Sequence, residues 1–177
     1  MGEVDFGPFR IVELQSLSGP QGHVYTIHFE SSRVSEFEAF AADQKIRTHK
    51  DFGETVQLIR TLAGADGAGF SPDFFEHRKY GKDDGGSNIL GYAKADKSKF
   101  EFSLRLYVMR FSRGVIILGG GCIKRGGGAL RKNRNCNYRY DRVHKAFLAI
   151  ANSIESGEVR IDQNGISGKT HIDQRST

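Results

Sequence analysis

The sequence predicts an α+β fold, a small twisted antiparallel sheet with an N-terminal helical hairpin packed on it and a C-terminal helix. Three observations lead to this prediction. Apolar residues alternate over 24–30 and 102–111, which is typical of strands. They recur every three or four residues over 52–62 and again over 143–154, which is typical of amphipathic helices. The period changes more than once along the chain, so strands and helices share one fold.

Length and composition are compatible with one such core. The chain has 177 residues, of which 38% are hydrophobic and 27% charged. No run approaches the about 20 apolar residues that span a bilayer, and no apolar segment follows a basic start, so we expect neither a membrane partner nor a signal peptide. Cys122 and Cys136 are too few for a disulfide scaffold, so we expect thiols and a cytoplasmic location. We assign residues 1–157 to one domain and 158–177 to a polar tail.

The first elements are a strand pair and the helical hairpin. Residues 9–30 are predicted to be extended, with a turn at 19–22 (GPQG). The helical hairpin is predicted over 35–64. Its two helices would each begin with a capping box, Ser35 to Glu38 and Asp51 to Glu54, and the second would end at Gly64.

A strand meander is predicted over 74–118, with Val115–Leu118 as a buried central strand. A basic loop and a helix are predicted over 119–157, because two glycine triplets flank Lys124 and Arg125 and helical spacing follows. The tail contains an Asn-Gly pair, which predicts either a weak hairpin with a type I′ turn or a disordered end.

Positive charge is concentrated in one part of the chain. The net charge is +5, and the window 124–145 alone carries +7, which leaves −2 for the rest. Aromatic residues (Tyr138, Tyr140 and Phe147) lie among these cations. A phosphate polymer is the natural partner of such a field, so we expect a nucleic-acid or ribosomal partner. A solvated basic face without a ligand is the alternative.

Residues 102–125, FSLRLYVMRF–SRGVIILGGGCIKR, resemble the RelE/ParE family of bacterial toxins, including its HigB branch. In that family an Arg-containing strand is followed by a turn, a buried strand and a loop that bears Lys or Arg. The order of elements extends the resemblance over residues 24–155. The resemblance implies either ribosome-dependent mRNA cleavage or inhibition of DNA gyrase without RNA cleavage. It also implies a cognate antitoxin that wraps the toxin and silences it.

The resemblance implies a cationic catalytic site. Arg105 matches the strand arginine that acts on the phosphate, and Lys124 and Arg125 match the basic residues after the next strand. Fixed cations stabilise the negative charge that develops on the phosphate during RNA cleavage. A lysine crowded by arginines is suited to act as a general base, and Lys79 is the candidate.

Other residues would hold the RNA. Tyr107 follows Arg105 on the same strand face, so its ring is the candidate for base stacking. The basic candidates for RNA contacts are Arg78, Arg110, Arg131, Lys132 and Arg134. The candidates for a C-terminal acid–base group are Tyr138, Tyr140 and His144.

Neither a metal nor a cofactor is expected. The spacing of Cys122 and Cys136 is not that of a zinc site, and no glycine run matches a P-loop. The leading hypothesis is the toxin component of a toxin–antitoxin system, acting as a ribosome-dependent mRNA endoribonuclease. Its partners would be an antitoxin, mRNA and the ribosome. The alternatives are a non-enzymatic ParE-like gyrase inhibitor and a non-toxic basic nucleic-acid-binding protein.

Overall fold

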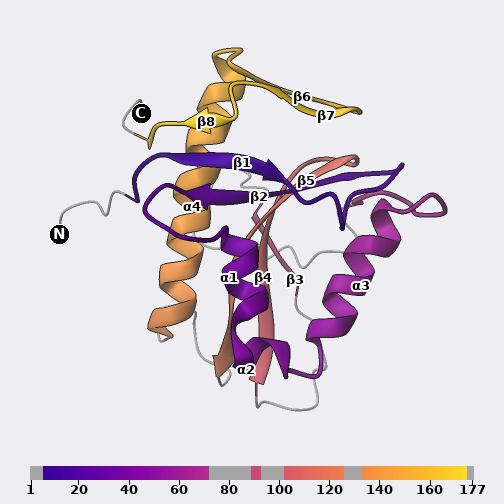
Figure 1. The fold of residues 1–177 in the computed structure, drawn as a ribbon, viewed down its shortest axis with the longest axis vertical. Helices are drawn as coiled ribbons and strands as arrows, with labels where there is room; N and C mark the ends of the chain where they lie inside the picture. Colours follow the sequence, from indigo (N-terminus) through magenta and orange to yellow (C-terminus); the bar gives the residue numbers. More distant parts are fainter. Residues whose placement is uncertain (1–5, 72–88, 93–101, 126–132, 175–177) are drawn as a thin grey trace.

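The computed structural model describes residues 6–71, 89–92, 102–125 and 133–174, which form a mixed α/β fold (Figure 1). The strands are β1 (Phe9–Glu13), β2 (His23–Phe29), β3 (Ile89–Tyr92), β4 (Phe102–Ser112), β5 (Val115–Arg125), β6 (Val159–Asp162), β7 (Gly165–Gly168) and β8 (His171–Ile172). The helices are α1 (Glu36–Ala42), α2 (Gln44–Arg47), α3 (Phe52–Ala63) and α4 (Arg134–Glu155). The C-terminal helix is confirmed as α4, which begins before the predicted residue 139.

Six strands form one sheet in the order β3-β4-β5-β2-β1-β8, and β6 pairs with β7 in a separate hairpin. The β1–β2 and β4–β5 pairs are antiparallel. β2 runs parallel to β5, with Val24 opposite Ile116, so the sheet is mixed and the prediction of an antiparallel sheet is wrong at its centre. Both strands are buried on both faces, which is typical of parallel neighbours.

Three helices follow the first two strands, so the prediction of an N-terminal helical hairpin does not match the structure. The first capping box is present: Ser35 Oγ accepts a bond from the Glu38 N–H, and Glu38 Oε2 accepts one from the Ser35 N–H. The Asp43 carboxylate caps α2 by accepting bonds from two of its N–H groups, which separates α2 from α1. Asp51 precedes α3 but makes no side-chain capping bond, so the second capping box is not formed.

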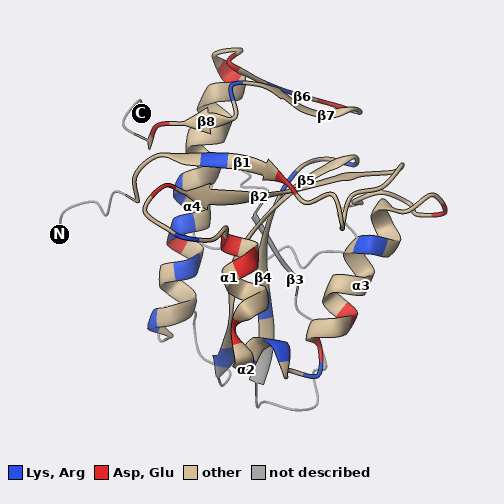
Figure 2. Cartoon of the chain, in the orientation of Figure 1, with Lys and Arg blue, Asp and Glu red and all other residues tan. Residues whose placement is uncertain are grey.

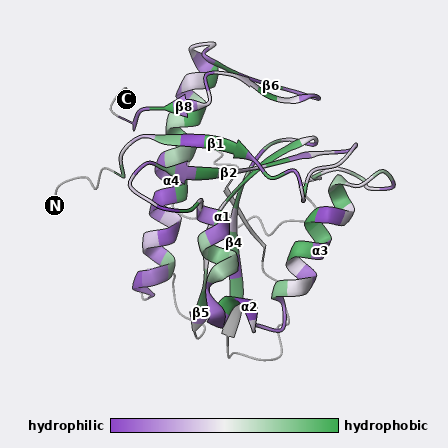
Figure 3. Cartoon of the chain, in the orientation of Figure 1, coloured by the Kyte–Doolittle hydropathy of each residue, from purple (hydrophilic) through white to green (hydrophobic). Residues whose placement is uncertain are grey.

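An apolar core lies on each face of the sheet. α4 covers one face and packs on Tyr107 and Met109, whereas α1–α3 cover the face that bears Leu106 and Val108. Alternation along β4 predicted this division, and it is confirmed. The helical spacing of α4 is visible as bands of hydrophobic and hydrophilic residues (Figure 3).

The glycine triplet 119–121 continues strand β5 up to Arg125, so the predicted loop at these residues is wrong. The helices approach the strand closely here. A Cβ on Gly119 would collide with Val143 of α4, and one on Gly121 would collide with the Arg105 carbonyl and the Phe40 ring of α1. Glycine is therefore required by close packing on both faces of the strand rather than by a turn.

Residues after α4 form strands. β6 and β7 make a hairpin, and β8 pairs with β1 at the edge of the main sheet. The hairpin contacts the main sheet through Tyr25, whose hydroxyl accepts a bond from the Ile166 N–H at 2.9 Å. No described residue except glycine has a positive φ, so the turn at Gln163 and Asn164 is not type I′.

Candidate functional site

Arg105 of β4 and Lys124 of β5 lie on the same face of the sheet. Arg105 pairs with Cys122, and Lys124 pairs with Ser103. The second pair lies two residues along each strand from the first. Paired residues of an antiparallel ladder share a face, as do residues two apart along a strand. This is the face that α4 covers, because Cys122 belongs to the α4 core. The structure therefore brings together two of the four predicted catalytic residues.

Both cationic side chains are largely enclosed. Arg105 is 4% exposed and Lys124 is 9% exposed. Charge interactions at this depth are screened less by the surrounding protein than they would be by water. A polymer reaches the two side chains only if what covers them moves.

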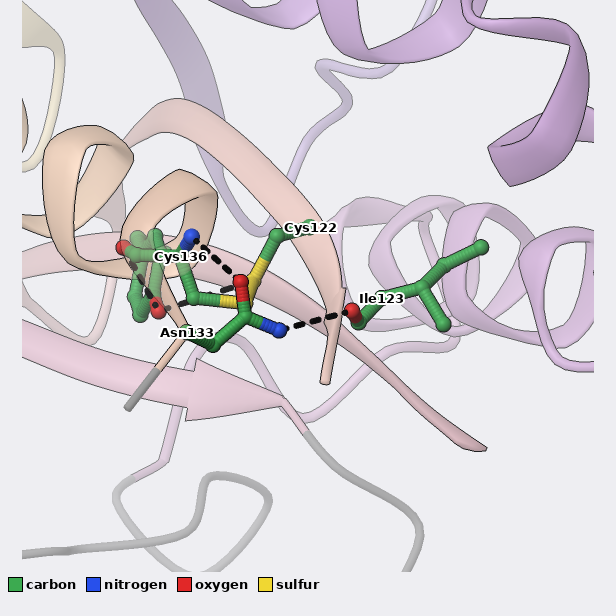
Figure 4. Close-up of a disulfide and its surroundings, with 5 residues drawn as sticks. Cys122, Ile123, Asn133 and Cys136 are labelled. Atoms are coloured by element: carbon green, nitrogen blue, oxygen red, sulfur yellow. Dashed lines mark hydrogen bonds between the residues drawn. A yellow bond between two sulfur atoms is a disulfide. The ribbon is translucent and has the colours of Figure 1, made fainter. Parts of the chain in front are cut away.

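The first turn of α4 packs on this face at Cys122 and is tied to β5 (Figure 4). Asn133 caps the helix by accepting a bond from the Cys136 N–H, and its amide donates to the Ile123 carbonyl at 3.4 Å. A disulfide joins Cys122 to Cys136. The expectation of free thiols is therefore wrong. Residues fourteen apart in the sequence meet because β5 extends through the glycine triplet before the chain returns as α4.

Tyr107 does lie on the face that bears Arg105, but it has no exposed ring surface. Its hydroxyl donates to the Cys136 carbonyl at 3.3 Å, and its ring meets that of Tyr140 edge-on at 5.6 Å. The predicted role in base stacking is therefore incompatible with its position. Alternation places Tyr107 on the correct face, but it contains no information about the helix that packs over that face.

Arg110 points to the opposite face from Arg105. Its Nε donates to the carbonyl of Phe70, a residue of the α1–α3 core. Burial, with a smaller contribution from Arg113, lowers the pKa of Arg110. It cannot join Arg105 at one phosphate. Arg125 is the last residue of β5, opposite Phe102, rather than a loop residue as predicted.

The remaining candidates divide into two groups. Those outside the described residues are Arg78, Lys79, Arg131 and Lys132. Arg134 is described: it is the first residue of α4 and is exposed.

Among the described residues near this site, exposed or partly exposed cations lie on α4, whose Lys and Arg residues are blue in Figure 2. Arg134 is exposed and the Arg139 side chain is 32% exposed. Arg142, by contrast, is buried against Glu36 of α1, with Arg142 Nη2 and Glu36 Oε1 2.7 Å apart. The basic window in the sequence therefore contains both an internal ion pair and an external surface. The sequence indicated the window but not this division.

The C-terminal acid–base candidates are not equivalent. Tyr140 is 9% exposed, and His144 stacks on its ring at 5.7 Å. Tyr138 is 47% exposed, and its hydroxyl accepts a bond from Arg142. Within the described ranges, no group of His, Cys, Asp or Glu side chains is arranged to hold a metal ion.

Comparison of the chain with models of protein families, with curated proteins and with solved structures finds no match. None of the helices in the described part of the chain combines the length and the apolar character needed to cross a membrane.

Proposed function

We propose that the protein is the toxin component of a toxin–antitoxin system, a RelE/ParE-like endoribonuclease that cleaves mRNA on the ribosome. The observation that supports this proposal best is the shared face of Arg105 and Lys124 on adjacent strands. The resemblance implies such a hairpin, with an arginine on its first strand and a basic residue at the end of its second.

In this reaction the 2′-hydroxyl of a nucleotide gives its proton to a base, for which Lys79 is the candidate, and its oxygen attacks the adjacent phosphorus. The bond from phosphorus to the 5′-oxygen breaks, and the 5′-oxygen takes up a proton as it leaves. Negative charge grows on the phosphate oxygens in the transition state, and pre-positioned cations stabilise it. Arg105 would bind two of these oxygens through its planar guanidinium, and Lys124 would supply a point charge beside it. No role in this reaction is assigned to Tyr107, because its hydroxyl is bonded to the Cys136 carbonyl and its ring packs against Tyr140.

This activity requires that RNA reach Arg105 and Lys124. Arg105 and Lys124 lie on the face that α4 covers, so the first turn of α4 has to move away from β5 before RNA can enter. The Cys122–Cys136 disulfide opposes that movement. The proposed cytoplasmic location would favour the reduced thiols, and the site would open more readily in that state. An antitoxin that keeps α4 in place would silence the protein.

The burial of the proposed catalytic residues favours a second candidate function, in which the protein binds its target without cleaving RNA. Arg105 and Tyr107 are enclosed, whereas Arg134 of α4 is exposed and Arg139 of α4 is partly exposed. This arrangement suits a protein that binds gyrase or a nucleic acid through its surface.

Induced expression in growing bacteria distinguishes the two functions. The nuclease is expected to stop translation rapidly, with new mRNA ends inside codons. Lys124→Gln should abolish these ends, whereas Arg113→Gln, an exposed cation at the other end of the β4–β5 hairpin, should retain them. An SOS response without new mRNA ends would support gyrase inhibition. Normal growth in every case would contradict both toxin functions.

A further inference from the structure

The outer side of α4 presents an exposed aromatic ring. Tyr138 is 47% exposed, whereas Tyr25, Tyr107 and Tyr140 are buried. An exposed tyrosine in a basic helix is the kind of side chain on which an unpaired base can stack. Tyr138 plays no part in the proposed cleavage at Arg105 and Lys124.

The Tyr138 ring is held in place before any ligand arrives. Its hydroxyl accepts a bond from Arg142 Nη1 at 3.2 Å, and Phe6 meets its ring edge-on at 5.7 Å. Arg142 is itself fixed by Glu36 on α1 and by the Phe29 ring, 4.1 Å from the guanidinium carbon. A ring held from several sides loses little conformational freedom when a base stacks on it.

Cations lie on both sides of the ring along the helix. Arg134 precedes Tyr138 by four residues and Lys145 follows it by seven, spacings that place all three on one side of α4. The guanidinium carbon of Arg139 is 5.9 Å from the centre of the Tyr138 ring. Arg142 contributes no free charge because Glu36 neutralises it.

The one acidic residue in this part of α4 is Asp141. It is bonded to the Asn137 amide at 3.3 Å, and burial raises its pKa, although His144 and Lys145 act in the opposite direction. Glu36 also lies 3.7 Å from Arg139, so this one carboxylate faces both arginines. Arg134, Arg139, Arg142 and Lys145 together outnumber Asp141 and Glu36, which leaves the surface positive.

We infer that the surface formed by Arg134, Tyr138, Arg139 and Lys145 binds single-stranded RNA. Tyr138 stacks on one unpaired base, and the cations contact the phosphates on either side of it. A duplex would bury the base faces and leave the ring unused, and an acidic protein segment would use the cations without needing the ring. The choice of RNA rests on the proposed function, but the surface does not include Arg105 or Lys124.

The test is equilibrium binding of a short fluorescent single-stranded RNA, followed by anisotropy at low salt. Tyr138→Ala is expected to weaken binding about 5- to 160-fold, the range that corresponds to removal of one stacking aromatic. Tyr138→Phe keeps the ring and should bind within about 2-fold of the unaltered protein. Leu148→Ala is the matched control, because Leu148 is equally exposed (46%) on the same helix.

The phosphate contacts have their own readout. The logarithm of the RNA affinity falls with the logarithm of salt concentration by about 0.7 for each phosphate neutralised on a single strand. Arg134→Gln and Arg139→Gln should each reduce this slope by about that amount, whereas Tyr138→Ala should leave it unchanged.

Three results would overturn the inference. One is equal binding by Tyr138→Ala and the unaltered protein; another is equal affinity for duplex RNA; the third is preference for an acidic peptide over RNA. The binding assay does not require cleavage. Binding that depends on Tyr138, together with an absence of mRNA cutting in cells, would retain this inference and reject the proposed nuclease. Cutting of mRNA in cells, together with RNA binding that is insensitive to Tyr138, would retain the proposed nuclease and reject this inference.

Discussion

Glu36 and Arg142 form a buried ion pair between α1 and α4. Glu36 Oε1 accepts bonds from Arg142 Nη2 at 2.7 Å and from Nε at 3.2 Å, across 106 residues of sequence. The carboxylate and the guanidinium are 3% and 8% exposed. Helices from opposite faces of the sheet are therefore joined at its margin, next to Gly120, where a Cβ would lie 3.0 Å from Glu36 Oε2.

Arg142→Met is expected to lower the free energy of unfolding by up to about 3–5 kcal/mol, because it leaves the buried Glu36 carboxylate with only the partly exposed Arg139, 3.7 Å away, as a counter-ion. Urea unfolding followed by circular dichroism measures this change. Lys169→Met is the matched control. It breaks the exposed pair with Glu158, in which both side chains are about half exposed, and should cost at most about 1 kcal/mol.

Glu36→Gln combined with Arg142→Met should recover part of the lost stability, since no charge then remains buried. A double variant as unstable as the sum of its single changes would contradict this account of the pair.

Gly121→Ala is expected to destabilise the protein by about 1–3 kcal/mol, because the added methyl meets the Arg105 carbonyl and the Phe40 ring. Gly53→Ala should act in the opposite direction. Gly53 lies exposed in the first turn of α3, and a Cβ there meets nothing within 4 Å, so a gain of about 0.4–1 kcal/mol is expected. Thermal unfolding of the two variants should therefore show shifts of opposite sign. Shifts of the same sign would contradict the close packing at β5.

Reduction of the Cys122–Cys136 disulfide is expected to lower the free energy of unfolding by about 3 kcal/mol, the loop-entropy contribution for a ring of this size. Urea unfolding with and without a dithiol reductant measures the difference. Cys122→Ala combined with Cys136→Ala should unfold identically in both buffers. Alkylation and mass measurement of protein taken directly from cells would show which form exists there, and a fully oxidised population would argue against the proposed cytoplasmic location.

The Glu38 carboxylate is expected to titrate below its ordinary pKa of 4.5, since bonds from the backbone and side chain of Ser35 stabilise its charged form. A carboxyl with a lowered pKa in the folded state adds stability above pH 4.5, and this stability is lost as the pH falls through the folded-state pKa. Carboxyl NMR titration of the folded protein measures the midpoint directly. Ser35→Ala should return the midpoint toward 4.5, and a midpoint already at or above 4.5 in the unaltered protein would contradict the capping box seen here.

Short-range patterns predicted much of the fold. Alternation along β4 separated Leu106 from Tyr107 onto the two faces, and the spacing of Val143 and Ile150 identified the buried side of α4. These predictions succeeded because each depends on residues that are neighbours in one element. The parallel pairing of β2 with β5 depends on contacts between distant segments, which periodicity does not contain.

The same limit explains the outcome at the candidate site. Arg105 and Lys124 share a face because of the register between β4 and β5. Alternation along β4 predicts the face of Arg105 but does not contain this register. It could not anticipate that α4 would cover them, or that Cys136 would reach Cys122. The glycine triplet favoured a loop because glycine is common in turns, but here the absence of side chains lets two helices approach one strand. From the sequence, Tyr138 is one of the aromatic residues of the basic window and an acid–base candidate, but no pairing of Tyr138 with Arg142 is predicted, although a separation of four residues is the spacing of a helical pair.

The bond between the Thr26 hydroxyl and the Leu118 carbonyl spans 92 residues and joins the parallel strands at the middle of the sheet. During synthesis, β2 emerges well before β5 and has to wait with one hydrogen-bonding edge and its apolar side chains uncovered. Folding dominated by such distant pairing is slow, and an uncovered edge can pair with another nascent chain. The yield of correctly folded protein should therefore depend on how long this interval lasts, and slower translation of the intervening segment would favour aggregation.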